Sequence, residues 1–203
     1  MRLLVILFPL AIAAQPVVTV TGPATIPAGK PATLTVSVSG TAGSNLAAIQ
    51  LSLAVSAGAL GASVTVPTAY STSCNAAGTC VTYSCNAAQV CSLSTLADGA
   101  VFTIPITFPA MSVAPIPVAT SGLLGASTAG AAVTLTAGAP YSLTVGPSAC
   151  SVLGQATITA KDAIALVQAI IGQAPCPTAF AAGCSLDNLE AVIIAATGGA
   201  CIL

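Results

Sequence analysis

The chain has 203 residues, of which only three are Lys or Arg and four are Asp or Glu, and it contains no His. Nucleic-acid binding and polybasic membrane attachment both need clustered basic side chains, so neither is expected. The lack of His excludes histidine catalysis and histidine ligation of zinc or haem. A hydrophobic content of 56% also excludes charge-driven disorder.

The first 14 residues have the pattern of a secretory signal peptide. Met1 and Arg2 precede an unbroken apolar run, which ends in small residues and is too short to span a bilayer. We expect cleavage after Ala13 or Ala14 and no membrane span in the mature protein. The expected location is therefore secreted, either extracellular or at the cell surface.

Residues 15–146 have the two-residue hydrophobic period of β-strands. In the segment 32–39, Leu and Val alternate with Thr and Ser, and the segments 49–55 and 102–108 repeat this scheme. Gly and Pro separate these and other short segments. The pattern predicts a mainly β protein, with a β-sandwich of the jelly-roll or immunoglobulin-like type.

The cysteines number eight, and an even number in an exported chain indicates disulfide bonds rather than a metal site. They form two groups of four: Cys74, Cys80, Cys85 and Cys91, then Cys150, Cys176, Cys184 and Cys201. The first group lies in a local repeat with a period of eleven residues. Nested pairs (74–91 with 80–85) and sequential pairs (74–80 with 85–91) fit this repeat equally well.

The hydrophobic period lengthens to that of helices in residues 147–203. Two loop–helix units, offset by 26 residues, each begin with a polar capping pair and end at glycine. The pairs are Thr159 with Asp162 and Ser185 with Asn188. We therefore expect a small C-terminal unit of two helices.

The acidic residues occupy positions that indicate structural roles. Asp162, Asp187 and Glu190 fall at predicted helix starts, and Asp98 precedes a turn glycine. Paired carboxylates can hydrolyse glycosides, but capping needs no charge, so an amide should replace any of the three helix-start acids at little cost. Without His, and without Ser or Cys beside a base, no nucleophile can be activated. We predict no catalytic residue and no enzyme.

The sandwich segment resembles a cohesin module. The resemblance rests on PAGKPATLTVSV at 27–38, IQLSL at 49–53 and LADGAVFTIPITF at 96–108. Cohesins join dockerin modules in extracellular complexes that degrade polysaccharides, so the resemblance implies binding of a protein partner or a polysaccharide. Bacterial immunoglobulin-like adhesion domains share the Pro-Ala-Gly turn. The alternative is therefore a structural surface or adhesion protein that packs against copies of itself.

Residues 147–203 resemble a dockerin, whose two units derive from EF-hand calcium loops. With Asp162 as loop position 12, positions 1, 3, 5, 7 and 9 hold Ser151, Leu153, Gln155, Thr157 and Thr159. In the second unit Asn188 holds position 12, and Pro177, Ala179 and Ala181 hold positions 1, 3 and 5. One carboxylate per loop cannot neutralise Ca²⁺, so we expect no metal and no other cofactor in this degenerate version.

Disulfides are expected to stabilise this unit in place of a metal, because so small a unit buries too little apolar surface to fold without a cross-link. Three pairings are possible for the second cysteine group. We favour Cys150–Cys201 as a terminal clasp, with Cys176–Cys184 across the second loop.

These features together predict a non-catalytic, secreted binding or scaffold protein. A sugar-binding surface would need exposed aromatic rings, and Tyr70 and Tyr83, beside the cysteine repeat, are the candidate ligand contacts. The two short helices can cover only part of each other. Their remaining apolar surface is expected to dock on the sandwich or on another molecule, and self-association is one form of this.

Overall fold

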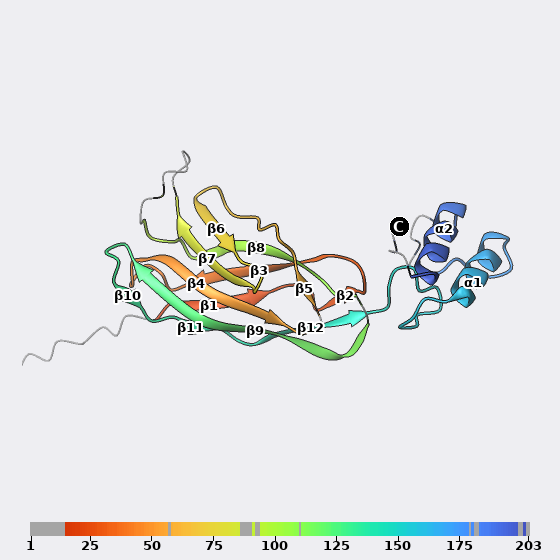
Figure 1. The fold of residues 1–203 in the computed structure, drawn as a ribbon, viewed down its shortest axis with the longest axis horizontal. Helices are drawn as coiled ribbons and strands as arrows, with labels where there is room; N and C mark the ends of the chain where they lie inside the picture. Colours follow the sequence, from red (N-terminus) through yellow and green to blue (C-terminus); the bar gives the residue numbers. More distant parts are fainter. Residues whose placement is uncertain are drawn as a thin grey trace, which may run out of the picture.

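A computed structural model describes residues 15–56, 58–85, 91, 94–109, 111–178, 180, 183–198 and 201. The signal peptide expected at residues 1–14 lies outside this part of the chain. The described protein is elongated, with a β-sandwich at one end and a pair of helices at the other (Figure 1).

Short alternating segments form the strands of the sandwich. They are β1 (Val17–Thr21), β2 (Thr25–Pro27), β3 (Ala32–Ser39), β4 (Leu46–Val55), β5 (Ala59–Leu60), β6 (Tyr70–Cys74), β7 (Thr79–Ser84), β8 (Gly99–Thr107), β9 (Ser112–Ser127), β10 (Ala132–Val133), β11 (Thr136–Ala137) and β12 (Tyr141–Gly146). In the described residues they make two sheets. The five-stranded sheet has the order β11-β1-β3-β8-β5, and the seven-stranded sheet has β2-β12-β9-β4-β7-β6, with β10 added beside β9.

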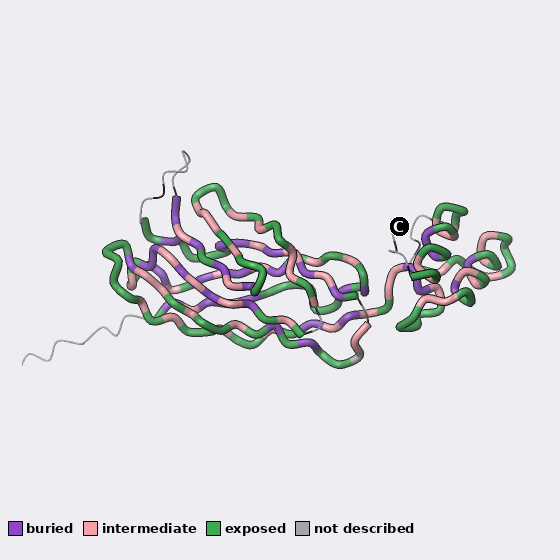
Figure 2. The backbone as a smooth tube through the Cα atoms, viewed as in Figure 1, coloured by how far each residue is buried: buried purple, intermediate pink, exposed green. Residues whose placement is uncertain are grey.

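The core lies between the two sheets and uses the inward half of each alternating segment. Leu34 and Val36 of β3 are completely buried, as are Phe102 and Ile106 of β8 and Leu51 of β4. The Thr and Ser residues between them face outward, so buried and more exposed positions alternate along the strands (Figure 2). The mainly β sandwich with two small helices is confirmed.

The first cysteine group is paired sequentially. Cys74 and Cys80 face each other across the β6–β7 hairpin and form one disulfide, and Cys85 and Cys91 form the next. The side-chain oxygen of Asn75 accepts hydrogen bonds from the N–H groups of Ala77 and Thr79, at 3.0 and 2.9 Å, and so shapes the hairpin turn.

The C-terminal unit contains α1 (Ala160–Ile170) and α2 (Leu186–Ala196), and each begins with a complete capping box, as the sequence predicts. Their shared core consists of buried residues from both helices and the adjoining loops: Cys150, Leu166, Phe180, Ala191 and Val192. Disulfides join Cys150 to Cys201 and Cys176 to Cys184. Among the described residues, neither helix has the length and apolar character needed to cross a membrane.

Candidate functional site

One row of side chains on the outer face of the seven-stranded sheet departs from the Thr and Ser pattern. Val81 of β7 and Leu124 of β9 are 37% and 61% exposed, although both are large and apolar. The strand register places Gln50 of β4 between them, opposite Val81 on one side and Leu124 on the other. Ser73 of β6 extends the row beyond Val81. We call this set the Val81–Leu124 row.

The rows on either side of the Val81–Leu124 row are uncharged. One contains Ser71, Tyr83, Ala48 and Ala126 in register across β6, β7, β4 and β9. The other contains Thr79, Ser52 and Ser121, and the hydroxyl oxygens of Thr79 and Ser52 are hydrogen-bonded at 2.9 Å. The cores of protein interfaces are depleted of charged residues, and this face has that character.

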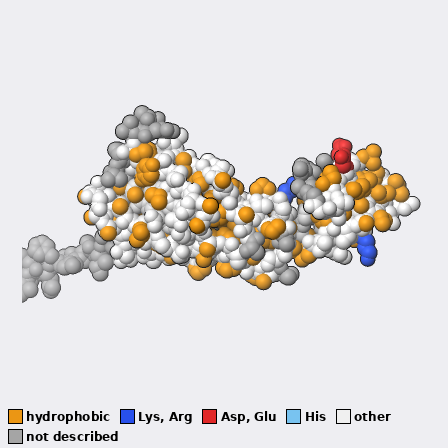
Figure 3. Space-filling view, viewed as in Figure 1, with side chains coloured by type: hydrophobic (Ala, Val, Ile, Leu, Met, Phe, Trp, Pro, Cys, Tyr) orange, Lys and Arg blue, Asp and Glu red, His pale blue; other side chains and the backbone are white. Residues whose placement is uncertain are grey.

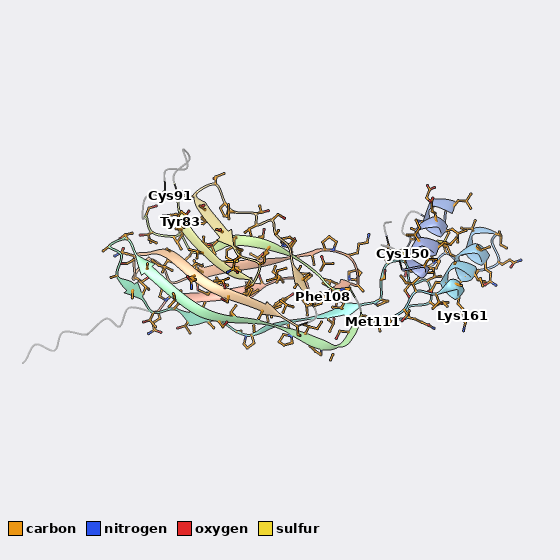
Figure 4. All side chains as sticks on the ribbon, in the orientation of Figure 1. Tyr83, Cys91, Phe108, Met111, Cys150 and Lys161 are labelled. Atoms are coloured by element: carbon orange, nitrogen blue, oxygen red, sulfur yellow. A yellow bond between two sulfur atoms is a disulfide. The ribbon has the colours of Figure 1, made fainter. Side chains whose placement is uncertain are left out.

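The two tyrosines predicted as ligand contacts lie on different sides of the hairpin. Tyr83 faces outward in the row next to Val81 (Figure 4). Tyr70 is half-buried, packs against the sandwich core, and accepts a hydrogen bond at its hydroxyl from the Ala97 N–H at 3.0 Å. The structure therefore does not bring them together on one surface.

Val81 and Leu124 are the site residues that the sequence analysis missed. Val81 carried a local signal, because it occupies an outward position in a strand whose inward positions hold Cys80 and Thr82. Leu124 carried no such signal on its own, since its neighbour Leu123 is also apolar and only their burial distinguishes them.

The recesses beside the β6–β7 turn offer no platform for a sugar ring. One, of about 290 Å³, is lined by Leu60, Gly61, Cys74, Asn75, Ile104 and neighbouring small residues. A second, of about 370 Å³, is lined by aliphatic residues and glycines of β4, β5 and the turn. Among the described residues, neither lining contains an aromatic side chain.

Two of the four carboxylates are fully engaged in holding loops. Asp98 accepts hydrogen bonds from the N–H and hydroxyl of Thr41, at 2.9 and 2.7 Å, and from the Gly40 N–H at 3.1 Å. The backbone and side-chain hydrogen bonds from Thr41, followed by that from Gly40, hold the pKa of Asp98 below its usual value. Asp162 is completely buried at the start of α1.

The loop before α1 is closed by hydrogen bonds between its own residues. The carboxylate of Asp162 accepts from the Leu153 N–H at 3.0 Å and from the Thr159 N–H and hydroxyl at 2.9 and 3.2 Å. The Ser151 hydroxyl donates to the Gln155 carbonyl at 2.9 Å and accepts from the Gln155 N–H at 2.8 Å. Positions 1, 3, 5 and 12 of the loop are thus linked directly, which leaves the residues present a poor fit for calcium.

The loop before α2 is held differently. Cys176 and Cys184 bridge it, and the side-chain oxygen of Asn188 accepts from the N–H and hydroxyl of Ser185. Ala179 and Ala181 lie outside the described residues. Within the part of the chain that the structure describes, no group of three or more His, Cys, Asp or Glu residues could hold a metal ion.

Comparisons with known proteins identify the fold of the sandwich. No family model and no curated protein sequence matches the chain. The non-cellulosomal cohesin of the archaeon Archaeoglobus fulgidus matches with a TM-score of 0.50 and 13% identity, over 65% of this chain and 91% of its own. The cohesin module of a Clostridium perfringens family 33 glycoside hydrolase matches with a TM-score of 0.52 and 10% identity, over 63% and 96%.

A third similar structure is the cohesin ScaC of Acetivibrio cellulolyticus, solved in complex with the ScaB dockerin. It has a TM-score of 0.51 and 12% identity, over 64% of this chain and 99% of its own. At such identities the likeness concerns the fold, and the chain therefore contains a cohesin-like β-sandwich. The dockerin resemblance of residues 147–203 stays a prediction.

Proposed function

We propose that this protein is a non-catalytic binding module that holds a partner protein against the outer face of β4, β7 and β9. The Val81–Leu124 row carries the proposal, because it places two exposed apolar side chains on an uncharged face. The similar cohesins solved in complex with dockerins, such as ScaC of Acetivibrio cellulolyticus, support a protein as the partner.

A binding role also agrees with how the acidic side chains are used. Asp98 and Asp162 accept hydrogen bonds from loop backbone groups, so both have a structural role in holding their loops. The four disulfides and the signal-like residues 1–14 favour an extracellular scaffold built from a sandwich at 15–146 and a dockerin-like unit at 147–203.

A polysaccharide ligand has less support, because Tyr83 is the one aromatic side chain in the three rows.

The test is a comparison of two matched variants in affinity capture from the culture fluid of the source organism. Immobilised residues 15–203 should retain a specific protein, identified by mass spectrometry. The double variant Val81→Asp with Leu124→Asp should lose it, since a buried unpaired charge opposes association. Thr33→Asp, an exposed change on the other sheet, is the control and should retain it. Equal retention by both variants would contradict the proposed face.

The same purified proteins also test the structural alternative, a surface protein that packs against copies of itself. Such a protein would form ordered assemblies at high concentration without any other component. Light scattering on the purified wild type and on the Val81→Asp, Leu124→Asp variant distinguishes the two functions, because only self-packing through this face predicts large particles that the variant abolishes.

A further inference from the structure

The two-helix unit carries most of the exposed large hydrophobic side chains of the described protein. Of the nine exposed large hydrophobic residues among the described positions, seven belong to this unit: Leu153, Ile164, Val167, Ile171, Leu186, Ile193 and Ile194. Hydrophobic side chains accordingly crowd the surface of the unit at its end of the molecule (Figure 3). Monomeric proteins rarely leave so dense a patch uncovered.

On each helix these residues form a stripe that is distinct from the buried side. On α1 and its C-cap the stripe is Ile164, Val167 and Ile171, at helical spacings of three and four, with 59%, 38% and 60% exposure. On α2 it is Leu186, Ile193 and Ile194, with 72%, 48% and 44% exposure. The stripe residues do not belong to the core of the unit, because Leu166 and Val192 fill the space between the helices.

The two stripes share one position of the internal duplication. The 26-residue shift lays Val167 on Ile193. The other stripe residues of one helix have no large apolar counterpart on the other, since Ile164 and Ile171 fall on Glu190 and Thr197. Within the described chain, α1 and α2 pack on each other and neither packs extensively on a strand of the sandwich. The two stripes, which together we call the helical face, are therefore left exposed by the sandwich of the same chain.

The charges beside the helical face are of both signs and are unpaired. Lys161, one turn before Ile164, projects from the start of α1 into solvent (Figure 4). Glu190 lies on α2 midway between Leu186 and Ile194 and is exposed. Neither forms an ion pair within the described residues. Figure 3 shows the basic and acidic side chains on opposite sides of the unit.

We propose that the helical face is an interface between two copies of this chain. Across a two-fold axis, α1 of each copy packs on α2 of the other, so the two stripes cover each other. Lys161 of each copy then meets Glu190 of the other. Because the two-fold axis repeats this contact, one Lys and one Glu per copy form two ion pairs in the dimer. A second copy is a suitable partner because the helical face carries both a basic and an acidic side chain, and so is complementary in charge to itself.

The exposed apolar area and the small number of basic side chains favour a second copy of the chain over a lipid surface as the partner of the helical face. A stable interface buries roughly 800 Å² on each partner, and six half-exposed aliphatic side chains with the small residues between them can supply most of that area. An interfacial helix instead needs several basic side chains beside its apolar face, and this unit has only Lys161.

The test measures the monomer–dimer equilibrium of oxidised residues 15–203 by sedimentation over a range of concentrations. Wild type should dimerise reversibly, and Ile164→Asp should be monomeric. Lys161→Glu and Glu190→Lys should each raise the dissociation constant by about threefold to tenfold, since each reversal sets like charges together twice. The double swap should restore the dimer, and so should an equimolar mixture of the two single variants.

The Val81→Asp, Leu124→Asp variant is the control that separates this inference from the proposed function. It should lose the partner protein and keep the dimer. A wild type that is monomeric at every concentration would overturn the inference. A dimer that Ile164→Asp leaves intact, or that the sandwich variant abolishes, would also overturn it, as would failure of the charge swap to rescue.

Discussion

Asp162 shows how one carboxylate can organise a loop without a metal ion. In an EF-hand loop, the side chain at position 12 reaches the other ligands through the bound cation. Here its two oxygens accept hydrogen bonds from Leu153 and Thr159 directly, and the side chain is completely buried. The sequence suggested only a helix cap, which an amide could also provide. The additional bond to Leu153 changes that expectation.

Replacing Asp162 by Asn should lower the free energy of unfolding of the helical unit by about 1–3 kcal/mol. Whichever way the amide turns, its NH₂ group faces a backbone N–H that has lost its acceptor. The matched control is Asn188→Asp, because the single side-chain oxygen of Asn188 accepts both Ser185 hydrogen bonds. An aspartate would keep this acceptor, and its second oxygen would replace the amide NH₂ group. Denaturant unfolding of both variants gives the comparison, and equal losses would contradict the assigned role of Leu153.

Asp98 should make the sandwich sensitive to acid. Its pKa is lowered by hydrogen bonds from Thr41 and Gly40, so the stabilisation is present above the unfolded pKa of about 3.8. It is lost as the pH falls through the lower folded value. Urea unfolding between pH 2 and 6 should therefore show a steeper acid loss for wild type than for Asp98→Asn, and NMR should report a carboxyl titration below 3.8. Parallel curves for the two proteins would refute this.

At the scale of elements, the loop before α1 and the loop before α2 use different substitutes for a metal. The first relies on the Ser151, Gln155 and Asp162 hydrogen bonds, and the second on Cys176–Cys184. Neither loop gathers enough carboxylate to bind calcium.

Removing or adding divalent cations should consequently leave the helical unit unchanged. We expect the thermal midpoint of the α1–α2 unfolding transition to be the same in EDTA and in millimolar Ca²⁺, because the loop groups already bond to each other. Reduction of the disulfides should lower it. Calorimetry in the three conditions checks this, and a calcium-dependent rise of several degrees would show that the loops do bind the ion.

Strands β3, β4 and β8, their inward core residues and both capping boxes could be predicted because each depends on residues that are close together in the sequence. The alternation around Leu34 and the Thr159–Asp162 spacing are visible within a few residues. The Val81–Leu124 row could not be predicted in this way, because it exists only once β4 sets the register of both neighbours. The pairing of Cys74 was open for the same reason, since its repeat fits two hairpin registers equally well.

At the scale of the whole molecule, the described structure divides its apolar residues between two separate cores. One lies between the sheets, and the other lies between α1 and α2. The sandwich is closed by pairing of strands that are distant in the sequence, such as β12 with β2, whereas the helical unit is closed by the Cys150–Cys201 bond. Because neither helix packs extensively on a strand in the described residues, the two parts have little reason to unfold together.

Removing the Cys150–Cys201 bond should therefore destabilise one part only. This bond closes a separation of 51 residues, and the loss of its constraint on the unfolded chain costs about 4 kcal/mol in the chain-entropy account. The double variant Cys150→Ala with Cys201→Ala should move the helical transition far down in calorimetry and leave the sandwich transition in place. Cys74→Ala with Cys80→Ala is the converse control, because it should lower only the sandwich transition. A single transition that both variants shift equally would mean that the sandwich and the helices form one cooperative unit.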